Sequence, residues 1–199
     1  MGKIFYIMGK SASGKDCIYK NLINDPGMLL SPLVLYTTRP IRSGETPGKE
    51  YQYVSDEELE SLRNQGKIIE ERSYHTVYGI WTYATADDGK IDLSQKDYLG
   101  IGTLESYVKI QKYYGGESVC AIYIEVEDGI RLERALKRER KQKKPKYAEM
   151  CRRFLADKED FKEKRIKEAG ITKHFPNNGD ISDCLAEIHK FIRVQRKTL

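Results

Sequence analysis

The chain alternates short apolar runs with longer segments in which apolar residues recur at helical spacing. The apolar runs are rich in β-forming residues, which predicts buried strands at residues 3–8, 33–37, 97–102 and 118–125. Helical spacing predicts helices at 15–24, around 104–114 and at 180–196. Because strands and helices alternate, we expect an α/β fold in which helices cover both faces of a parallel sheet.

The pattern changes between residues 37 and 86. Glycine and proline interrupt this segment at Gly44, Pro47 and Gly48. Short strand-like pieces follow at 51–55, 67–72 and 77–81. Ser55 and Glu58 have the spacing of a capping box, which predicts a helix that begins there and ends near Gly66. Such a pattern is typical of a small mixed α/β lobe inserted into a larger fold.

Two long helices are predicted at 130–144 and 147–169, separated at Pro145. Within them, residues 131–153 hold 11 basic and 3 acidic side chains, whereas the rest of the chain holds 24 basic and 27 acidic ones. The formal net charge of +5 therefore comes from one basic segment on an otherwise slightly acidic chain.

Composition excludes several classes of protein. No apolar run approaches the roughly 20 residues that a membrane helix needs, and Ile4–Met8 is too short for a signal-peptide core. The basic segment lacks the interleaved aromatic residues of single-strand binders and the wide basic face of duplex binders. We therefore expect neither a membrane nor a nucleic acid as partner. The sequence leaves monomer and dimer both open.

The cysteines and histidines are scattered along the chain. No C-x-x-C pair is present, which predicts free thiols in a reducing cytoplasm at Cys17, Cys120, Cys151 and Cys184. No metal-ligand spacing relates the three histidines, His75, His174 and His189. Any metal is therefore expected to be a hard cation bound by oxygen atoms.

Residues 9–15 match the motif G-x-x-x-x-G-K, directly after a predicted strand and directly before a predicted helix. In this context the backbone N–H groups surround phosphate oxygens, the helix dipole adds to the attraction, and Lys15 supplies a positive charge to the β- and γ-phosphates. We predict that nucleotide phosphates bind the loop residues Gly9, Lys10, Ser11, Ala12, Ser13, Gly14, Lys15 and Asp16.

Asp16 departs from this motif. The position ordinarily holds serine or threonine, whose hydroxyl binds Mg²⁺. A carboxylate is also a hard oxygen ligand, so we expect Asp16 to hold Mg²⁺ directly or through water. The alternative is that Asp16 is only a favourable acidic residue in the first turn of a helix.

A second group of residues follows the phosphate loop in a fixed order. It runs Thr37-Thr-Arg39-Pro-Ile-Arg42-Ser-Gly44-Glu, then Gly48-Lys-Glu-Tyr51, then Glu70, then Tyr78-Gly79. With the phosphate loop, this order resembles the guanylate kinases, closely to about Gly79 and more loosely towards the C-terminus. The resemblance implies a P-loop NTPase fold and transfer of phosphate from ATP, with Mg²⁺, to GMP or dGMP in the cytoplasm.

The chemistry of these residues suits a nucleoside monophosphate. A dianionic phosphate fits two guanidinium groups and two phenol donors, here Arg39, Arg42, Tyr51 and Tyr78. Guanine presents N1–H and N2–H₂ as adjacent donors, which one carboxylate can accept, and the resemblance gives this role to Glu70. The alternatives are surface salt bridges of the arginines with Glu45 or Glu50, and core packing of the tyrosines.

The resemblance assigns the basic segment to a helical lid over the transferring phosphates. Arg134 and Arg138 match the family's R-x-x-x-R spacing, and Arg153 matches the arginine of an R-L-like pair. With Lys15 they are expected to stabilise the charge that develops in phosphoryl transfer; the alternative is a solvated charged helix. Asn178 lies in a partial match to a stretch that helps to hold adenine.

The implied layout is one domain over all 199 residues. Its core comprises 1–36, 86–130 and 154–199, the acceptor-binding lobe comprises 37–85, and the lid comprises 131–153.

Four further positions depart from the family pattern, among them Ile80, where serine or threonine usually follows Tyr-Gly. The two aspartates that follow the family's third strand, one for the Mg²⁺ shell and one near the acceptor nucleoside, are replaced by Gly100 and Gly102. We expect these glycines to leave open space against the nucleotide. A serine that donates to guanine O6 aligns with Leu35, which has no donor.

Three functions therefore stay open. The first is a guanylate kinase in which Asp16 compensates for the missing aspartates. The second is a P-loop kinase with a different small phosphate-bearing acceptor. The third is a catalytically silent module that binds a phosphopeptide, but such a module would have no use for Lys15.

Overall fold

Five parallel strands form the main sheet of the molecule, in the order β2-β7-β1-β8-β9. The computed structural model describes residues 1–49, 51–76 and 79–197. The strands of this sheet are β1 (Ile4–Met8), β2 (Leu30–Pro32), β7 (Asp97–Gly102), β8 (Val119–Glu125) and β9 (His174–Pro176). All five residues of β1 are fully buried, as expected for a central parallel strand covered on both faces.

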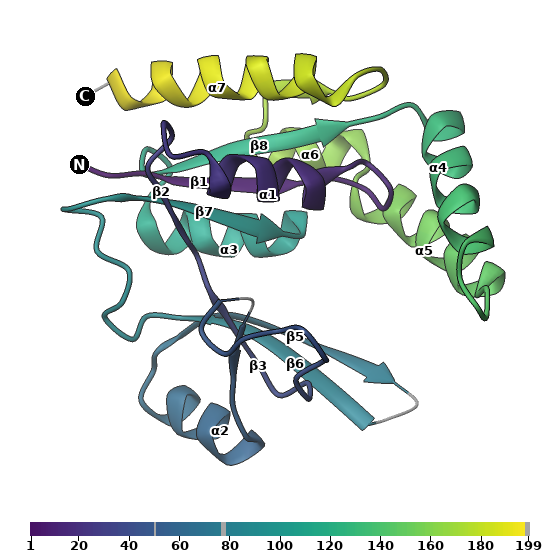
Figure 1. Cartoon of the computed structure of the whole chain (residues 1–199). Helices are drawn as coiled ribbons and strands as arrows, with labels where there is room; N and C mark the ends of the chain where they lie inside the picture. Colours follow the sequence, from purple (N-terminus) through teal and green to yellow (C-terminus); the bar gives the residue numbers. More distant parts are fainter. Residues whose placement is uncertain (50, 77–78, 198–199) are drawn as a thin grey trace.

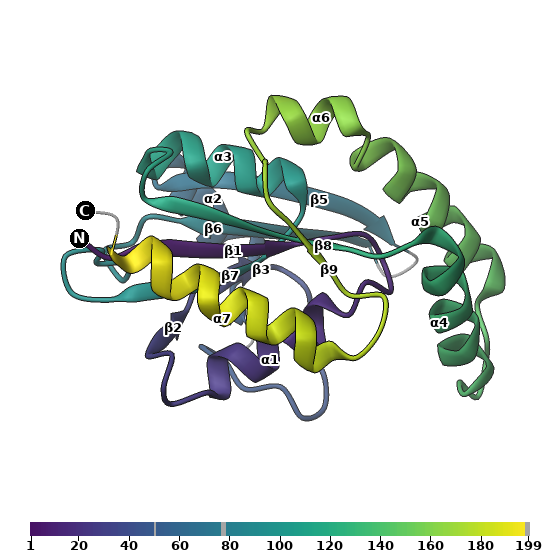
Figure 2. The same ribbon diagram turned by 90° about the horizontal axis from the view of Figure 1, so that it is seen from above.

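Alternate residues of β1 enter two separate cores. Ile4, Tyr6 and Met8 pack with α3 (Leu104–Tyr114) and α6 (Glu163–Glu168). Phe5 and Ile7 pack on the other face with α1 (Lys15–Asn24) and α7 (Ile181–Lys197). Figures 1 and 2 show these helices on either side of the sheet. The predicted α/β fold with a helix-covered parallel sheet is confirmed.

A second, mixed sheet has the order β4-β3-β6-β5. Its strands are β3 (Leu35–Thr37), β4 (Tyr51–Tyr53), β5 (Ile68–Thr76) and β6 (Gly79–Ala86). Helix α2 (Asp56–Asn64) covers one face, where Leu59 packs against Tyr36, Ala84 and Ala86. The predicted capping box is present. The Ser55 side chain accepts a hydrogen bond from the Glu58 backbone N–H, and the Glu58 side chain accepts one from the Ser55 backbone N–H.

Helices α4 (Asp128–Arg140) and α5 (Tyr147–Asp160) form a projecting hairpin, called here the basic hairpin. Figure 1 shows it beyond the carboxyl end of β8, on the side where β1 leads into α1. The carboxyl edge of a parallel sheet is the usual position for a ligand in α/β folds. Within the described residues, no helix is long and apolar enough to cross a membrane.

Three details of the expected elements are wrong. The apolar run 33–37 is not one strand, because β2 ends before it in the main sheet and β3 begins within it in the second sheet. The helix expected at 147–169 ends at residue 160, where buried Phe161 stacks on Tyr123 at 5.6 Å, and α6 follows separately. Strand β9 is only three residues long and was not expected.

Candidate active site

The phosphate loop connects the end of β1 to the start of α1, and its shape depends on two glycines. Gly14 caps α1 with a φ of 87°, and a Cβ there would lie 2.7 Å from Nδ2 of Asn177. At Gly9 a Cβ would lie 2.7 Å from the carbonyl oxygen of Ile124. Ala12 also has a positive φ of 62°, which is uncommon for a residue with a side chain and concentrates at functional loops.

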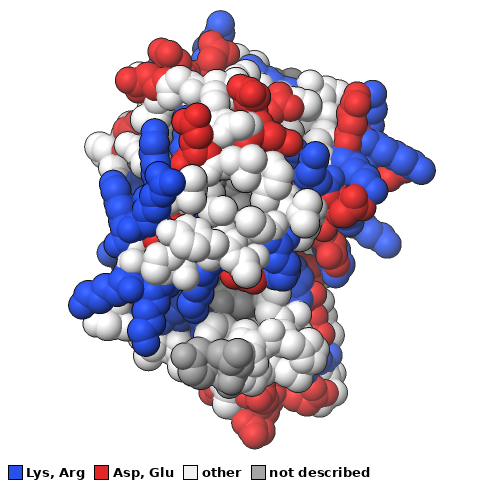
Figure 3. Space-filling view, turned by 90° about the vertical axis from the view of Figure 1, so that its right-hand side faces the viewer, with Lys and Arg blue, Asp and Glu red and all other residues white. Residues whose placement is uncertain are grey.

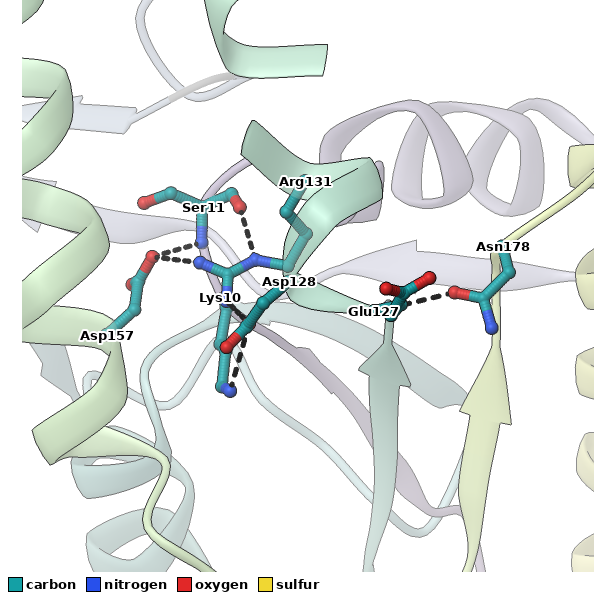
Figure 4. Close-up of polar contacts among 7 residues, drawn as sticks. All are labelled: Lys10, Ser11, Glu127, Asp128, Arg131, Asp157 and Asn178. Carbon is teal, nitrogen blue, oxygen red and sulfur yellow. Dashed lines mark hydrogen bonds and ion pairs between the residues drawn. The ribbon is translucent and has the colours of Figure 1, made fainter. Parts of the chain in front are cut away.

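Asn177 fixes the second half of the loop from outside it. Its Nδ2 donates to the Ser13 carbonyl oxygen at 2.8 Å, and the residue is only 3% exposed. The neighbouring Asn178 is exposed, and its Oδ1 accepts from the backbone N–H of Glu127 at 2.9 Å (Figure 4). Asn178 therefore joins the start of the basic hairpin to β9, and its adenine-binding role stays a prediction. Asn177 was not expected from the sequence, although it lies beside Asn178.

Arg131 and Asp157 fix the first half of the loop from the basic hairpin. Arg131 is 1% exposed, and its Nε donates to the Ser11 carbonyl oxygen at 3.1 Å. Asp157 Oδ2 accepts both from Nη2 of Arg131 at 3.1 Å and from the backbone N–H of Ser11 at 2.8 Å (Figure 4). Asp128 accepts from Nη1 of Arg131 at 2.8 Å and lies 3.6 Å from Nζ of Lys10.

This cluster attaches both hairpin helices to the phosphate loop. Sequence reasoning missed it because neither Arg131 nor Asp157 belongs to a motif, and Arg131 was only one of 11 basic residues in its segment.

Lys15 lies in a partly desolvated environment that contains charges of both signs. Burial is the largest influence on its pKa and lowers it; Asp16 and Asp157 oppose this, and Arg153 and Arg138 lower the pKa further. The structure thus brings two of the three expected hairpin arginines close enough to act on the Lys15 charge. Arg134 is half-buried on the same helix as Arg138. Lys15 and the two arginines are the cations here that suit the phosphates of a nucleotide.

Figure 3 views the molecule from the hairpin side. Lys and Arg side chains gather at both margins of this face, with a largely uncharged surface between them.

The expected phosphate clamp lies on the second sheet. Arg39 is 3% exposed and its guanidinium lies 5.3 Å from the centre of the Tyr51 ring. Its Nη2 also donates to both carboxylate oxygens of Glu45, at 2.8 and 3.0 Å, so the alternative of a salt bridge is present for this arginine. Hydrogen bonding from Arg39 is the main reason why the pKa of Glu45 falls to about 2. Arg42 is exposed and lies over the Trp81 ring at 6.0 Å.

Tyr78, the other expected clamp residue, lies outside the described residues, as does Glu50.

Glu70 is buried on β5, at the other edge of the second sheet from β4. Its Oε1 accepts from the Thr85 hydroxyl at 3.0 Å, and its Oε2 lies 3.3 Å from Nε of Arg72. Burial raises the pKa of Glu70, while the Arg72 charge and the Thr85 hydrogen bond lower it. Arg72 was not expected from the sequence; the only signal is its position two residues after Glu70, on the same face of a strand.

The expected open space at Gly100 and Gly102 is wrong, because Tyr6 of the neighbouring β1 fills it. A Cβ on Gly100 would lie 2.5 and 2.8 Å from two Tyr6 ring carbons, and a Cβ on Gly102 would lie 2.2 Å from the Tyr6 hydroxyl. Tyr6 is fully buried and its hydroxyl has no hydrogen-bond partner among the described residues. The glycines therefore make room for an aromatic side chain, and they leave β7 without a carboxylate at these positions.

The donors available to a cation are few. Among the described residues, no group of three or more His, Cys, Asp or Glu side chains could hold a metal by itself. Asp16 is exposed in the first turn of α1, directly after Lys15. One carboxylate beside a phosphate loop fits a hard cation that shares its remaining ligands with phosphate oxygens and water.

Comparison with known proteins gives a consistent result. A family model described as guanylate kinase matches residues 1–164. The chain is similar to guanylate kinases from Neisseria gonorrhoeae (39% identical over 98 residues, 49% of this chain and 45% of that protein). It is also similar to one from Bdellovibrio bacteriovorus (26% over 108 residues, 52% of this chain and 58% of that protein). The chain thus spans about half the length of the curated relatives that it matches.

A solved structure resembles nearly the whole chain. The crystal structure of guanylate kinase from Anaplasma phagocytophilum matches with a TM-score of 0.62, covering 99% of this chain and 88% of that chain. The sequence identity of this pair is 23%, so the match establishes a shared fold.

Proposed function

Because the chain belongs to the guanylate kinase family, we propose that it transfers the γ-phosphoryl group of ATP to GMP or dGMP, giving ADP and GDP or dGDP. The observation that carries the proposal is the arrangement around Lys15. An intact phosphate loop lies at the carboxyl edge of the main sheet, and Arg138 and Arg153 of the basic hairpin act on the Lys15 charge. A silent phosphopeptide-binding module would have no use for this arrangement.

In this proposal, each part of the site has one task. The backbone N–H groups of the phosphate loop and Lys15 hold the β- and γ-phosphates of ATP. Arg39, Arg42, Tyr51 and Tyr78 hold the phosphate of the acceptor, and Glu70 accepts hydrogen bonds from its base. Arg134, Arg138 and Arg153 stabilise the charge on the transferring group, which is the main task of a protein in phosphoryl transfer.

Mg²⁺ is proposed as the metal that accompanies ATP, where it would neutralise the charge that develops between the β- and γ-phosphates. Asp16 would hold it directly or through water. The layout of core, acceptor-binding lobe (37–85) and lid (131–153) is part of the same proposal. So is a cytoplasmic location, which the free thiols of all four cysteines support.

The test is an ADP-release assay with Mg·ATP and a panel of acceptors: GMP, dGMP, AMP, CMP and UMP. We expect turnover with GMP or dGMP that is lost in Lys15→Ala and kept in Lys20→Ala, an exposed lysine on the same helix. The absence of turnover above background with every acceptor would refute the proposal.

A further inference from the structure

Glu70 and Arg72 lie on the face of the second sheet that carries the acceptor-binding candidates. Residues two apart on a strand share a face, and so do residues directly opposite each other on adjacent strands. Arg72 of β5 is opposite Tyr83 of β6, and Tyr83 is opposite Thr37 of β3. Two residues before Thr37, Leu35 is opposite Tyr51 of β4. The Tyr51 and Tyr83 rings are 5.5 Å apart, so this face is continuous from the clamp to the Glu70–Arg72 pair.

The pair is buried but its hydrogen bonding is incomplete. The Glu70 side chain is 0% exposed and the Arg72 side chain 13%. Nη1 of Arg72 donates to the Thr103 hydroxyl at 3.1 Å. Within the described part of the chain, however, Oε2 of Glu70 and Nε of Arg72 complete no hydrogen bond although both atoms are buried. The two atoms face each other 3.3 Å apart as an ion pair, and this pair leaves lone pairs on the Glu70 carboxylate for a further donor.

Arg72 changes what this end of the site can recognise. Guanine offers N1–H and N2–H₂ as adjacent donors. Hydrogen bonding to both requires two available hydrogen-bond acceptors side by side. Here Thr85 already donates to Oε1 of Glu70, and Oε2 lies beside a guanidinium, which donates hydrogen bonds and accepts none. Each carboxylate oxygen has two lone pairs, so Oε1 can still accept from N1–H beside the Thr85 hydroxyl. An amino group at C2 directed at Oε2 would lie against the Arg72 guanidinium, which is another donor.

No side chain of β7 relieves this mismatch. Thr103, the partner of Arg72, directly follows Gly102, and Gly102 packs on Tyr6 and offers no carboxylate. The strongest charge acting on Glu70 is therefore that of Arg72, with Lys109 and Glu105 of α3 acting more weakly. A guanidinium there is complementary to a hydrogen-bond acceptor, such as a carbonyl oxygen, or tolerates a plain C–H group.

We propose that Arg72 sets the specificity of the acceptor site by excluding the 2-amino group from recognition. The protein then also phosphorylates 6-oxopurine nucleoside monophosphates with hydrogen at C2 (inosine monophosphate) or a carbonyl oxygen at C2 (xanthosine monophosphate). This inference rests on the proposed kinase activity. The bond from the γ-phosphorus of ATP to its bridging oxygen breaks, and a bond to an acceptor phosphate oxygen forms. ADP leaves with the electron pair of the broken bond, and no further reactant is needed.

The test compares kcat/KM for the GMP, inosine and xanthosine monophosphates in the native protein and in Arg72→Met. In the native protein we expect the inosine compound within about threefold of GMP, and the xanthosine compound at or above GMP. In Arg72→Met we expect GMP to be preferred by about 10-fold or more, the usual effect of a hydrogen bond to a charged group. The matched control is Arg63→Met, which removes an ion pair with Glu71 on the other face of β5 and should leave the ratios unchanged.

Ratios within one protein preparation are independent of the fraction that is folded. A native preference for GMP of about 100-fold or more over both other compounds would overturn the inference. So would ratios that are the same in native protein and Arg72→Met.

If no monophosphate is turned over, the proposed function fails, and calorimetric binding of the same three compounds tests Arg72 separately. Comparable affinities in the native protein, shifted towards GMP in Arg72→Met, would support the inference. Binding of GMP alone, or of none of the three, would refute it.

Discussion

At the scale of single residues, two carboxylates of the acceptor-binding lobe have pKa values that their surroundings shift in opposite directions. Glu45 is partly exposed and bonded to Arg39, and its pKa of about 2 keeps it ionised at any working pH. Glu70 is buried, and burial raises its pKa although Arg72 partly offsets the effect. Of these two carboxylates, Glu70 is therefore the one that loses its charge first as the pH falls.

The pH dependence of acceptor use should report this difference. A raised pKa means that Glu70 takes up its proton at a higher pH than an ordinary glutamate, so kcat/KM for GMP should fall on the acidic side of neutrality. Removal of the Arg72 cation raises the Glu70 pKa further, so Arg72→Met should move this acid limb to higher pH. Lys109 also lowers the Glu70 pKa and Glu105 raises it, and both are present in each protein. Two results would contradict Glu70 as the titrating group. One is an acid limb of the kcat/KM profile that moves to lower pH in Arg72→Met, and the other is an acid limb that persists unchanged in Glu70→Gln.

The two adjacent asparagines at the end of β9 should have separable effects. Asn177→Ala leaves the Ser13 carbonyl oxygen without its buried donor, so ATP and GTP should both bind the phosphate loop several-fold more weakly. Asn178→Ala should weaken the binding of ATP more than that of GTP if Asn178 contacts adenine. Equilibrium titration with both nucleotides measures the two effects. An equal loss of affinity for ATP and GTP in Asn178→Ala would contradict the predicted base-binding role of Asn178.

At the scale of elements, β1 and β7 meet through Tyr6 and two glycines, and this contact explains why β7 carries no acidic side chain at positions 100 and 102. Tyr6 lies where any side chain at Gly100 or Gly102 would begin. A carboxylate at position 100 or 102 of β7 and a tyrosine at position 6 of β1 therefore exclude each other. The difference from the family pattern is one coupled change in packing, and it leaves Asp16 as the proposed protein ligand for Mg²⁺.

A double-mutant cycle tests this coupling. Gly102→Ala should lower the free energy of unfolding by about 1–3 kcal/mol, the usual cost of overpacking. Tyr6→Phe removes the hydroxyl that a Cβ at 102 would meet at 2.2 Å, so the same substitution should cost clearly less in that background. Gly100→Ala meets ring carbons and should not be rescued by Tyr6→Phe.

Urea unfolding followed by circular dichroism measures each free energy. Gly179→Ala is the control, because nothing lies within 4 Å of a Cβ at that position. Equal costs for Gly102→Ala with and without the Tyr6 hydroxyl would show that the two positions are not coupled.

At the scale of the whole molecule, the basic hairpin brings distant positive charge to the phosphate loop. Arg131 and Asp157 anchor the hairpin to Ser11, and from this anchor Arg138 and Arg153 reach the surroundings of Lys15. Two basic side chains of the hairpin thus act on the phosphate-loop lysine.

Arg153→Ala should therefore reduce kcat by about 10²–10³-fold, as removal of a group that stabilises the transition state does, with little change in GMP affinity. Arg152→Ala is the matched control, since Arg152 is exposed and paired with Glu149. Steady-state kinetics with Mg·ATP and GMP measures both. An unchanged kcat in Arg153→Ala would favour the alternative of a solvated charged helix.

Much of the fold follows from local signals in the sequence. The fold class, the phosphate loop between β1 and α1, and the capping box of α2 were predicted correctly, because short segments determine them. The strand at 33–37 was wrong because its apolar run contains the crossing from one sheet to the other. The long helix at 147–169 was wrong because packing of Phe161 interrupts it. The resemblance to the guanylate kinases is confirmed by the family model.

The parts of the site that were missed depend on contacts between distant segments. Asn177 reaches Ser13 across 164 positions of sequence, and Arg131 reaches Ser11 across 120. Tyr6 was read only as part of a buried strand, and nothing in its neighbours predicts that it fills the space beside Gly102. Such contacts have no signature in a single sequence.

The proposed function depends on the passage of phosphate from ATP to GMP at Lys15. Incubation of the protein with Mg²⁺, GMP and ATP labelled at the γ-phosphate, followed by chromatography of the products, tests it most directly. We expect the label to appear in GDP, and Lys15→Ala to abolish the transfer. Label that stays in ATP, or appears only in inorganic phosphate, would contradict it.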